Sequence, residues 1–113
     1  LYPSWAASVN HGFGDVGLRF YPPFAYFVLA GAQWFTGSWF EASIIAFWLW
    51  FFLGGVGIYF WAREEFSGRA ALAAAVVYTF APYHVNQIYN AFTYAEFAAA
   101  GVLPFCFLFA HRV

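Results

Sequence analysis

The stretch that decides the fold is ASIIAFWLWFFLGGVGIYFWA, residues 42–62, which contains no charged side chain. As an α-helix this run is about 30 Å long, which matches the hydrocarbon core of a bilayer. The sequence therefore predicts a transmembrane helix over residues 40–62, with Glu41 where the helix enters the membrane. The glycines of this helix, at positions 54, 55 and 57, offer small surfaces for close helix packing. The alanines of residues 70–75, in the next segment, do the same.

Composition supports a membrane location. Of the 113 residues, 65% are hydrophobic and only 8% are charged, too few to cover a small soluble domain with polar groups. The net charge of −1 argues against nucleic acid as a partner, because nucleic acid would call for a basic patch. Because the chain starts at Leu1 and contains no Met, we expect it to be a piece of a longer integral membrane protein.

The remaining segments extend this prediction to an all-α fold of polytopic transmembrane helices. Residues 22–36 open with prolines and are too short to span comfortably, so we expect an interfacial helix. The prediction is a single membrane domain over residues 1–113, composed of an outer loop (1–21), the interfacial helix (22–36) and transmembrane helices at 40–62, 69–83 and 93–111.

Arginine positions predict the orientation. Arg63 and Arg69 share one turn, and Arg112 falls on the same side if each predicted span crosses once. Basic residues favour the cytoplasmic side of a membrane. We therefore expect a multi-pass protein of the inner (plasma) membrane, with residues 1–38 on the outer face and residues 63–69 in the cytoplasm. Aromatic residues at the outer surface should form a belt: Trp39, Tyr78, Tyr83, Tyr89 and Tyr94.

One motif suggests a dinucleotide site but lacks its context. Residues 12–17, GFGDVG, match G-x-G-x-x-G, which binds a dinucleotide only between a strand and a helix. The flanking residues predict neither element, and no acidic residue follows at the distance expected for a ribose contact. Glycines that form turns explain the match.

Glu96 is the only acidic residue from residue 70 to residue 111. Ionisable groups at membrane depth are costly and are therefore functional candidates by default. The segment Thr93-Tyr94-Ala95-Glu96 also fits a capping box, in which Thr93 caps the new helix and Glu96 bonds back to its backbone. The residues favour both interpretations equally, and one carboxylate at a helix end can serve both.

Further polar residues are candidate ligands. His84 and Asn86 lie in the turn before Glu96, and the three side chains could offer nitrogen and oxygen ligands to a divalent cation or a phosphate. No spacing typical of metal ligands supports this, and an interfacial polar role for His84 is the more common case. Asp15 and Arg19, four residues apart, either pair with each other or orient a carboxylate toward substrate.

Short motifs spread over the whole chain carry a family resemblance. They are Trp5, NHGFG at 10–14, RFYPPFAY at 19–26, FAPYH at 80–84, YAEF at 94–97 and LPF at 103–105. Together they resemble a family of bacterial and archaeal membrane proteins, the 6-pyruvoyl-tetrahydropterin synthase-related family. Despite that name, its members look like polytopic GT-C type glycosyltransferases, similar to protein mannosyltransferases and to the aminoarabinose transferases of lipid A.

The resemblance implies a topology and a chemistry. In such transferases a first span leads to a large outer loop, an interfacial helix and three further spans, so residues 22–36 would be the interfacial helix. It implies a polyprenyl-phosphate sugar as donor and a divalent cation as cofactor. It also implies that an acidic residue just after the first span, upstream of Leu1, is the catalytic base. Glu96 matches the position of an acid at the outer start of the fourth span in related transferases. The resemblance therefore implies that Glu96 binds a phosphate or a metal ion, or belongs to the acceptor site.

The chain departs from the family pattern at Tyr21-Pro22-Pro23, where the aminoarabinose transferases have Glu-Lys-Pro, and so lacks a charged pair there. Tyr21 and its aromatic neighbours in the loop could instead stack on a sugar. The leading hypothesis is a fragment of a glycosyltransferase that acts on the outer face. The alternatives are a non-catalytic protein that binds or translocates a lipid-linked precursor, and a structural subunit in which Glu96 is only a helix cap.

Overall fold

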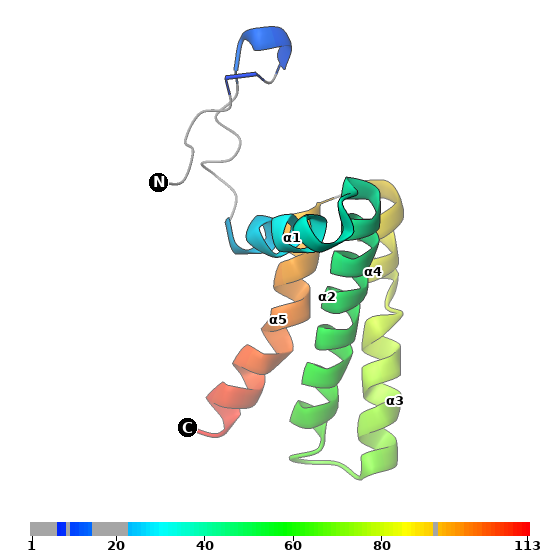
Figure 1. Ribbon diagram of the computed structural model, residues 1–113. Coiled ribbons are helices and arrows are strands. Elements are labelled where there is room, and N and C mark those ends of the chain that lie inside the picture. Colours follow the sequence, from blue (N-terminus) through cyan, green and yellow to red (C-terminus); the bar gives the residue numbers. More distant parts are fainter. Residues whose placement is uncertain (1–6, 9, 15–22, 92) are drawn as a thin grey trace.

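The computed structural model describes residues 7–8, 10–14, 23–91 and 93–113, and every element in these ranges is helical (Figure 1). This confirms the predicted all-α class. In chain order the elements are the 3₁₀ turn η1 (Asn10–Gly12), the helices α1 (Pro23–Thr36), α2 (Trp39–Ala62), α3 (Gly68–Thr79) and α4 (Pro82–Asn86), the π-helical turn η3 (Gln87–Ala91) and the helix α5 (Tyr94–His111).

Two of the described helices, α2 and α5, are long and apolar enough to cross a membrane. Only 22% of the most apolar window of α2 and 33% of that of α5 are buried inside the protein. The core helix of a soluble protein would be mostly buried, whereas Trp48 and Phe52 of α2 and Phe109 of α5 are exposed. Uncovered apolar faces of this length fit a bilayer and support the predicted membrane fold.

The third predicted span, residues 69–83, is interrupted. Helix α3 ends at Thr79 and is 12 residues long, or about 18 Å. Ala81 adopts an extended conformation (φ −56°, ψ 143°), because the ring of the following Pro82 disfavours helical backbone at the preceding residue. The chain then continues as α4 and η3, so the predicted outer turn is itself a folded helical segment.

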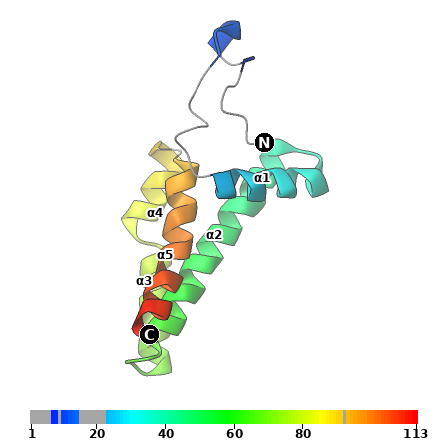
Figure 2. The same ribbon diagram turned by 90° about the vertical axis from the view of Figure 1, so that its left-hand side faces the viewer.

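Helix α1 lies across the ends of α2 and α5 (Figures 1 and 2). Its bounds are within one residue of the predicted interfacial helix at 22–36. It ends where Gly37 takes a positive φ of 71°, and the Gly37 N–H bonds to the Gln33 carbonyl at 2.8 Å, as in a typical glycine helix stop. A transverse helix is the geometry that an interfacial position requires, and the position itself stays a prediction.

Small residues bring α2 close to α5 (Figure 2). A Cβ atom on Gly57 would lie 2.8 Å from the Cβ of Pro104, and one on Gly101 would lie 2.8 Å from the backbone oxygen of Trp50. No side chain fits in such gaps without movement of the neighbouring atoms. The predicted role of the α2 glycines in close packing is confirmed, and Gly101 supplies the matching surface on α5.

A hydrogen bond between α3 and α5 compensates for a proline. Pro104 lies inside α5 and has no N–H to donate to the carbonyl of Ala100, four residues earlier. The Tyr78 hydroxyl donates to that carbonyl oxygen at 2.8 Å. Since an unpaired backbone carbonyl is costly in a membrane, Tyr78 turns inward and does not take its predicted place in the aromatic belt.

Replacing Tyr78 with Phe should therefore lower the free energy of unfolding by about 1–2 kcal/mol, since it leaves the Ala100 carbonyl unpaired. Thermal unfolding of the detergent-solubilised protein measures this. The same change at the exposed Tyr83 is the matched control. In a Pro104→Ala background, where residue 104 again has an N–H, the Tyr78→Phe change should cost less. An equal cost in both backgrounds would contradict this explanation.

Candidate functional site

A cluster of polar side chains joins η3 to the start of α5. In Figure 1 both segments lie at the end of the bundle where α1 lies. We call Gln87, Thr93 and Glu96 the Glu96 cluster. The Glu96 Oε2 atom accepts a hydrogen bond from the Gln87 side-chain Nε2 at 3.2 Å, and it lies 3.2 Å from the Thr93 hydroxyl. The Thr93 hydroxyl also contacts the Gln87 side-chain oxygen. Gln87 is 6% exposed while Glu96 is exposed, so a buried amide anchors a carboxylate that a ligand can reach.

The hydrogen bond that the predicted capping box requires from the Thr93 side chain is not formed. Thr93 is the N-cap residue of α5, but its side chain makes no capping bond to the helix backbone. Its hydroxyl faces the side chains of Gln87 and Glu96 instead. Glu96 still lies in the first turn of α5, where the helix dipole favours a negative charge. The Glu96 carboxylate is therefore positioned by the side chains of Gln87 and Thr93.

Gln87 is the member of this cluster that sequence reasoning missed. It begins the π-helical turn η3, and the wider π turn is a feature often found at functional sites. Asn86 and Ile88 flank Gln87, and Val85 lies one residue further, so the neighbouring apolar residues give only a weak signal that this amide is buried. That signal alone does not identify Glu96 as the partner of Gln87.

His84 lies in an aromatic pocket and not in the Glu96 cluster. Its ring packs against Tyr78 (centroids 4.7 Å apart), Tyr83, Phe51 and Phe97. It is 5% exposed, and its Nδ1 atom has no hydrogen-bond partner. His84 is therefore part of the buried aromatic packing that joins α4 to α2, α3 and α5.

The described residues do not fit a divalent cation. Among them, no three His, Cys, Asp or Glu side chains come together. Glu96 is the only carboxylate of its cluster, and the Gln87 amide points an N–H at it, which would repel a metal ion. The other predicted site residues, Asp15, Arg19 and Tyr21, lie outside the described residues, and Asn86 is exposed on α4.

An apolar groove of about 470 Å³ adjoins this end of the bundle. Phe47 and Phe51 line it from α2, and Val85 and Ile88 line it from α4 and η3. Both phenylalanine rings also pack on Phe97, one residue beyond Glu96. A reachable carboxylate and an apolar groove at the same end of the bundle suit a ligand that has both a polar group and a hydrocarbon part.

Comparison with known proteins gives one match. The family model described as "6-pyruvoyl-tetrahydropterin synthase related domain; membrane protein" matches residues 18–113. No curated protein and no solved structure matches the chain.

Proposed function

Because the chain belongs to the 6-pyruvoyl-tetrahydropterin synthase related family of membrane proteins, we propose that it is part of an inner-membrane glycosyltransferase. In this proposal the full-length protein moves a sugar from a polyprenyl-phosphate donor to an acceptor on the outer face. The observation that carries it is the Glu96 cluster, a carboxylate anchored by the buried Gln87 at the end of the bundle where α1 lies.

Electrostatics favours a hydroxyl group, and not a phosphate, as the ligand of Glu96. The three described arginines, Arg63, Arg69 and Arg112, all lie at the opposite end of the molecule. Without a nearby cation, a carboxylate repels an anionic phosphate but accepts a strong hydrogen bond from a hydroxyl. Glu96 would therefore orient a substrate hydroxyl, and the donor phosphate would need cations from outside the described residues.

The sugar transfer then proceeds as follows, with Glu96 orienting a substrate hydroxyl. The acceptor oxygen forms a bond to the anomeric carbon of the sugar, the bond from that carbon to the phosphate oxygen breaks, and a base takes the hydroxyl proton. The base would be the acid expected upstream of Leu1. Glu96 would hold a hydroxyl in position, and aromatic loop residues such as Tyr21 would cover the sugar.

The test uses the full-length protein in liposomes with radiolabelled polyprenyl-phosphate hexose or pentose. The proposal expects label to move to an acceptor while polyprenyl phosphate is released. Retention of the intact donor without release would instead favour the second candidate, a protein that binds or translocates a lipid-linked precursor. The apolar groove lined by Phe47, Phe51, Val85 and Ile88 supports this candidate as well. If the label is not transferred and the donor is not retained either, both candidate functions are wrong.

The proposed orientation can be tested separately. Cysteines placed at Ser38 and at Ser67, with Cys106 changed to Ala and no other cysteine present, should differ in accessibility. A membrane-impermeant maleimide should label residue 38 in intact spheroplasts and residue 67 only after permeabilisation. The reverse pattern would place residues 63–69 on the outer face and exclude the proposed topology.

A further inference from the structure

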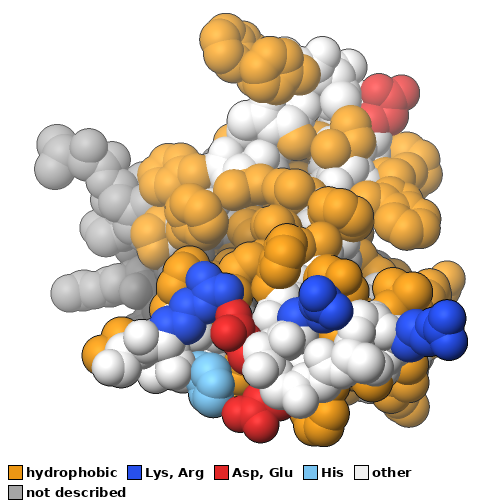
Figure 3. Space-filling view, turned by 90° about the horizontal axis from the view of Figure 1, so that it is seen from below, with side chains coloured by type: hydrophobic (Ala, Val, Ile, Leu, Met, Phe, Trp, Pro, Cys, Tyr) orange, Lys and Arg blue, Asp and Glu red, His pale blue; other side chains and the backbone are white. Residues whose placement is uncertain are grey.

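Charged side chains gather at the end of the bundle opposite Glu96, as Figure 3 shows from below. In a membrane, this is the end at which α2 and α5 would leave the hydrocarbon. All of these side chains are exposed. The turn between α2 and α3 contributes Arg63, Glu64, Glu65 and Arg69, and the end of α5 contributes His111 and Arg112.

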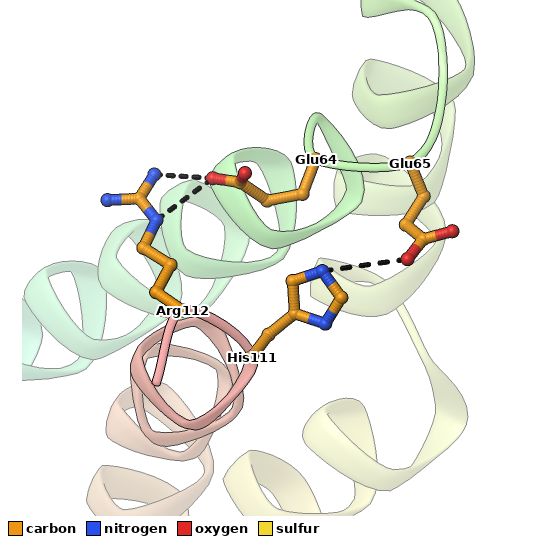
Figure 4. A network of polar contacts seen from close by, with 4 residues as sticks. All are labelled: Glu64, Glu65, His111 and Arg112. Carbon is orange, nitrogen blue, oxygen red and sulfur yellow. Dashed lines mark hydrogen bonds and ion pairs between the residues drawn. The ribbon is translucent and has the colours of Figure 1, made fainter.

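The two glutamates of this end differ in their partners (Figure 4). The Glu64 Oε1 atom accepts hydrogen bonds from the Arg112 guanidinium through Nη2 and through Nε, the latter at 3.0 Å. The Glu65 Oε1 atom lies 3.5 Å from the His111 Nε2 atom, which is longer than an ordinary hydrogen bond. A guanidinium is permanently charged, whereas an imidazole loses its proton near neutral pH. The Glu64 side chain is 31% exposed and that of Glu65 61%, so Glu65 is the carboxylate that an external cation can reach.

A groove of about 660 Å³ begins at Glu65 and follows α3. Glu65 and His111 line its charged end, and Ala81, which follows the end of α3, lines its far end. The residues between them are apolar or aromatic: Ile58, Trp61 and Ala62 of α2, Phe66 of the turn, and Ala74, Val77 and Tyr78 of α3. The groove thus joins an apolar surface to the Glu65 carboxylate.

The depth of the groove favours a lipid chain over a further helix as its occupant. Its lining starts just before α3 begins and ends just after α3 ends, and α3 is about 18 Å long. The groove therefore covers roughly half of the ~30 Å hydrocarbon core, which is about one leaflet. An acyl chain enters from the surface and stays within one leaflet, whereas a transmembrane helix crosses both. Within the groove Phe66 and Val77 are 64% and 72% exposed, so the described residues leave it uncovered.

We propose that this groove binds a phospholipid with a primary ammonium head group, such as phosphatidylethanolamine. The ammonium donates hydrogen bonds to the Glu65 carboxylate, and one acyl chain lies in the groove beside Trp61. Charge complementarity selects this occupant, because Arg63 and Arg69 do not line the groove and a carboxylate at its mouth attracts a cation. A primary ammonium has three N–H donors, whereas the trimethylammonium of phosphatidylcholine has none. This lipid site lies at the other end of the bundle from Glu96 and does not depend on the proposed sugar transfer.

The test measures quenching of Trp61 fluorescence in the full-length protein, reconstituted in phosphatidylcholine bilayers that contain a fixed fraction of one lipid with brominated acyl chains. The contribution of Trp61 is the part of the quenching that is lost in Trp61→Phe, which keeps a ring against Phe107. We expect brominated phosphatidylethanolamine to be preferred over brominated phosphatidylcholine by roughly threefold to tenfold, the effect of one additional hydrogen bond. Brominated phosphatidylglycerol, which is anionic, should quench Trp61 less than phosphatidylethanolamine does.

Glu65→Gln should bring this preference close to one, because a neutral amide attracts an ammonium only weakly. The matched control is Glu64→Gln/Arg112→Gln, which removes the neighbouring ion pair without a change in net charge and alters no residue of the groove, so it should keep the preference. Equal quenching by phosphatidylethanolamine and phosphatidylcholine would overturn the proposal, as would a preference for phosphatidylglycerol or one that survives Glu65→Gln. Absence of any Trp61 quenching would show that protein covers the groove, and would overturn it as well.

Discussion

Glu96→Gln is expected to reduce kcat/KM for sugar transfer by the full-length protein by roughly tenfold to a hundredfold. The reason is the loss of charge: the amide oxygen of Gln still accepts a hydrogen bond from a substrate hydroxyl, but without the extra strength that a carboxylate supplies. The Gln87 amide can still donate to the new side chain, so the variant should insert and fold normally. The measurement is initial rates in liposomes, with unfolding temperature recorded in parallel.

Glu41→Gln is the matched control, because Glu41 is an exposed acid in the first turn of α2, just as Glu96 is in the first turn of α5. It removes the same charge from the same end of the molecule, and transfer should stay close to wild type. If Glu96→Gln also keeps full activity and costs about a kilocalorie of stability or less, Glu96 acts only on helix stability and the proposed role is wrong.

The largest structural effect is expected for Gly101→Val, which should lower the free energy of unfolding by about 3 kcal/mol. The first added carbon would lie 2.8 Å from the Trp50 backbone oxygen and 3.3 Å from its Cα. Backbone atoms cannot rotate away, so α5 must shift away from α2. Because the Trp50 indole donates to the Tyr94 hydroxyl at 2.9 Å, this shift should also disturb the start of α5.

Gly31→Val tests the same change without the contact. A Cβ on Gly31 of α1 meets nothing within 4 Å, so this variant should be neutral or slightly stabilising. Thermal unfolding of the two variants in the same detergent makes the comparison. Similar unfolding temperatures for both would mean that α2 and α5 do not approach each other at Gly101 as closely as described.

Most helix bounds could be predicted from local signals. Helix α1 begins after Pro22 and ends before Gly37, α2 ends just before Arg63, and α5 begins after Thr93, each within one residue of expectation. Proline, glycine and charged residues act on their own backbone or on the adjacent turn, so their effect is visible in the sequence. The same rule explains the one large miss, since Pro82 ends α3 four residues earlier than the apolar run suggests.

The sequence by itself determined that this chain is an all-α membrane protein, because the length and apolarity of a helix are properties of one segment. Only the tertiary structure decided what the polar residues do. Gln87 reaches Glu96 because η3 folds back on α5, and Tyr78 reaches the Ala100 carbonyl because α3 packs beside a proline-containing helix. Both hydrogen bonds join segments that no local pattern relates, since each buried polar group bonds to whatever partner helix packing brings within reach.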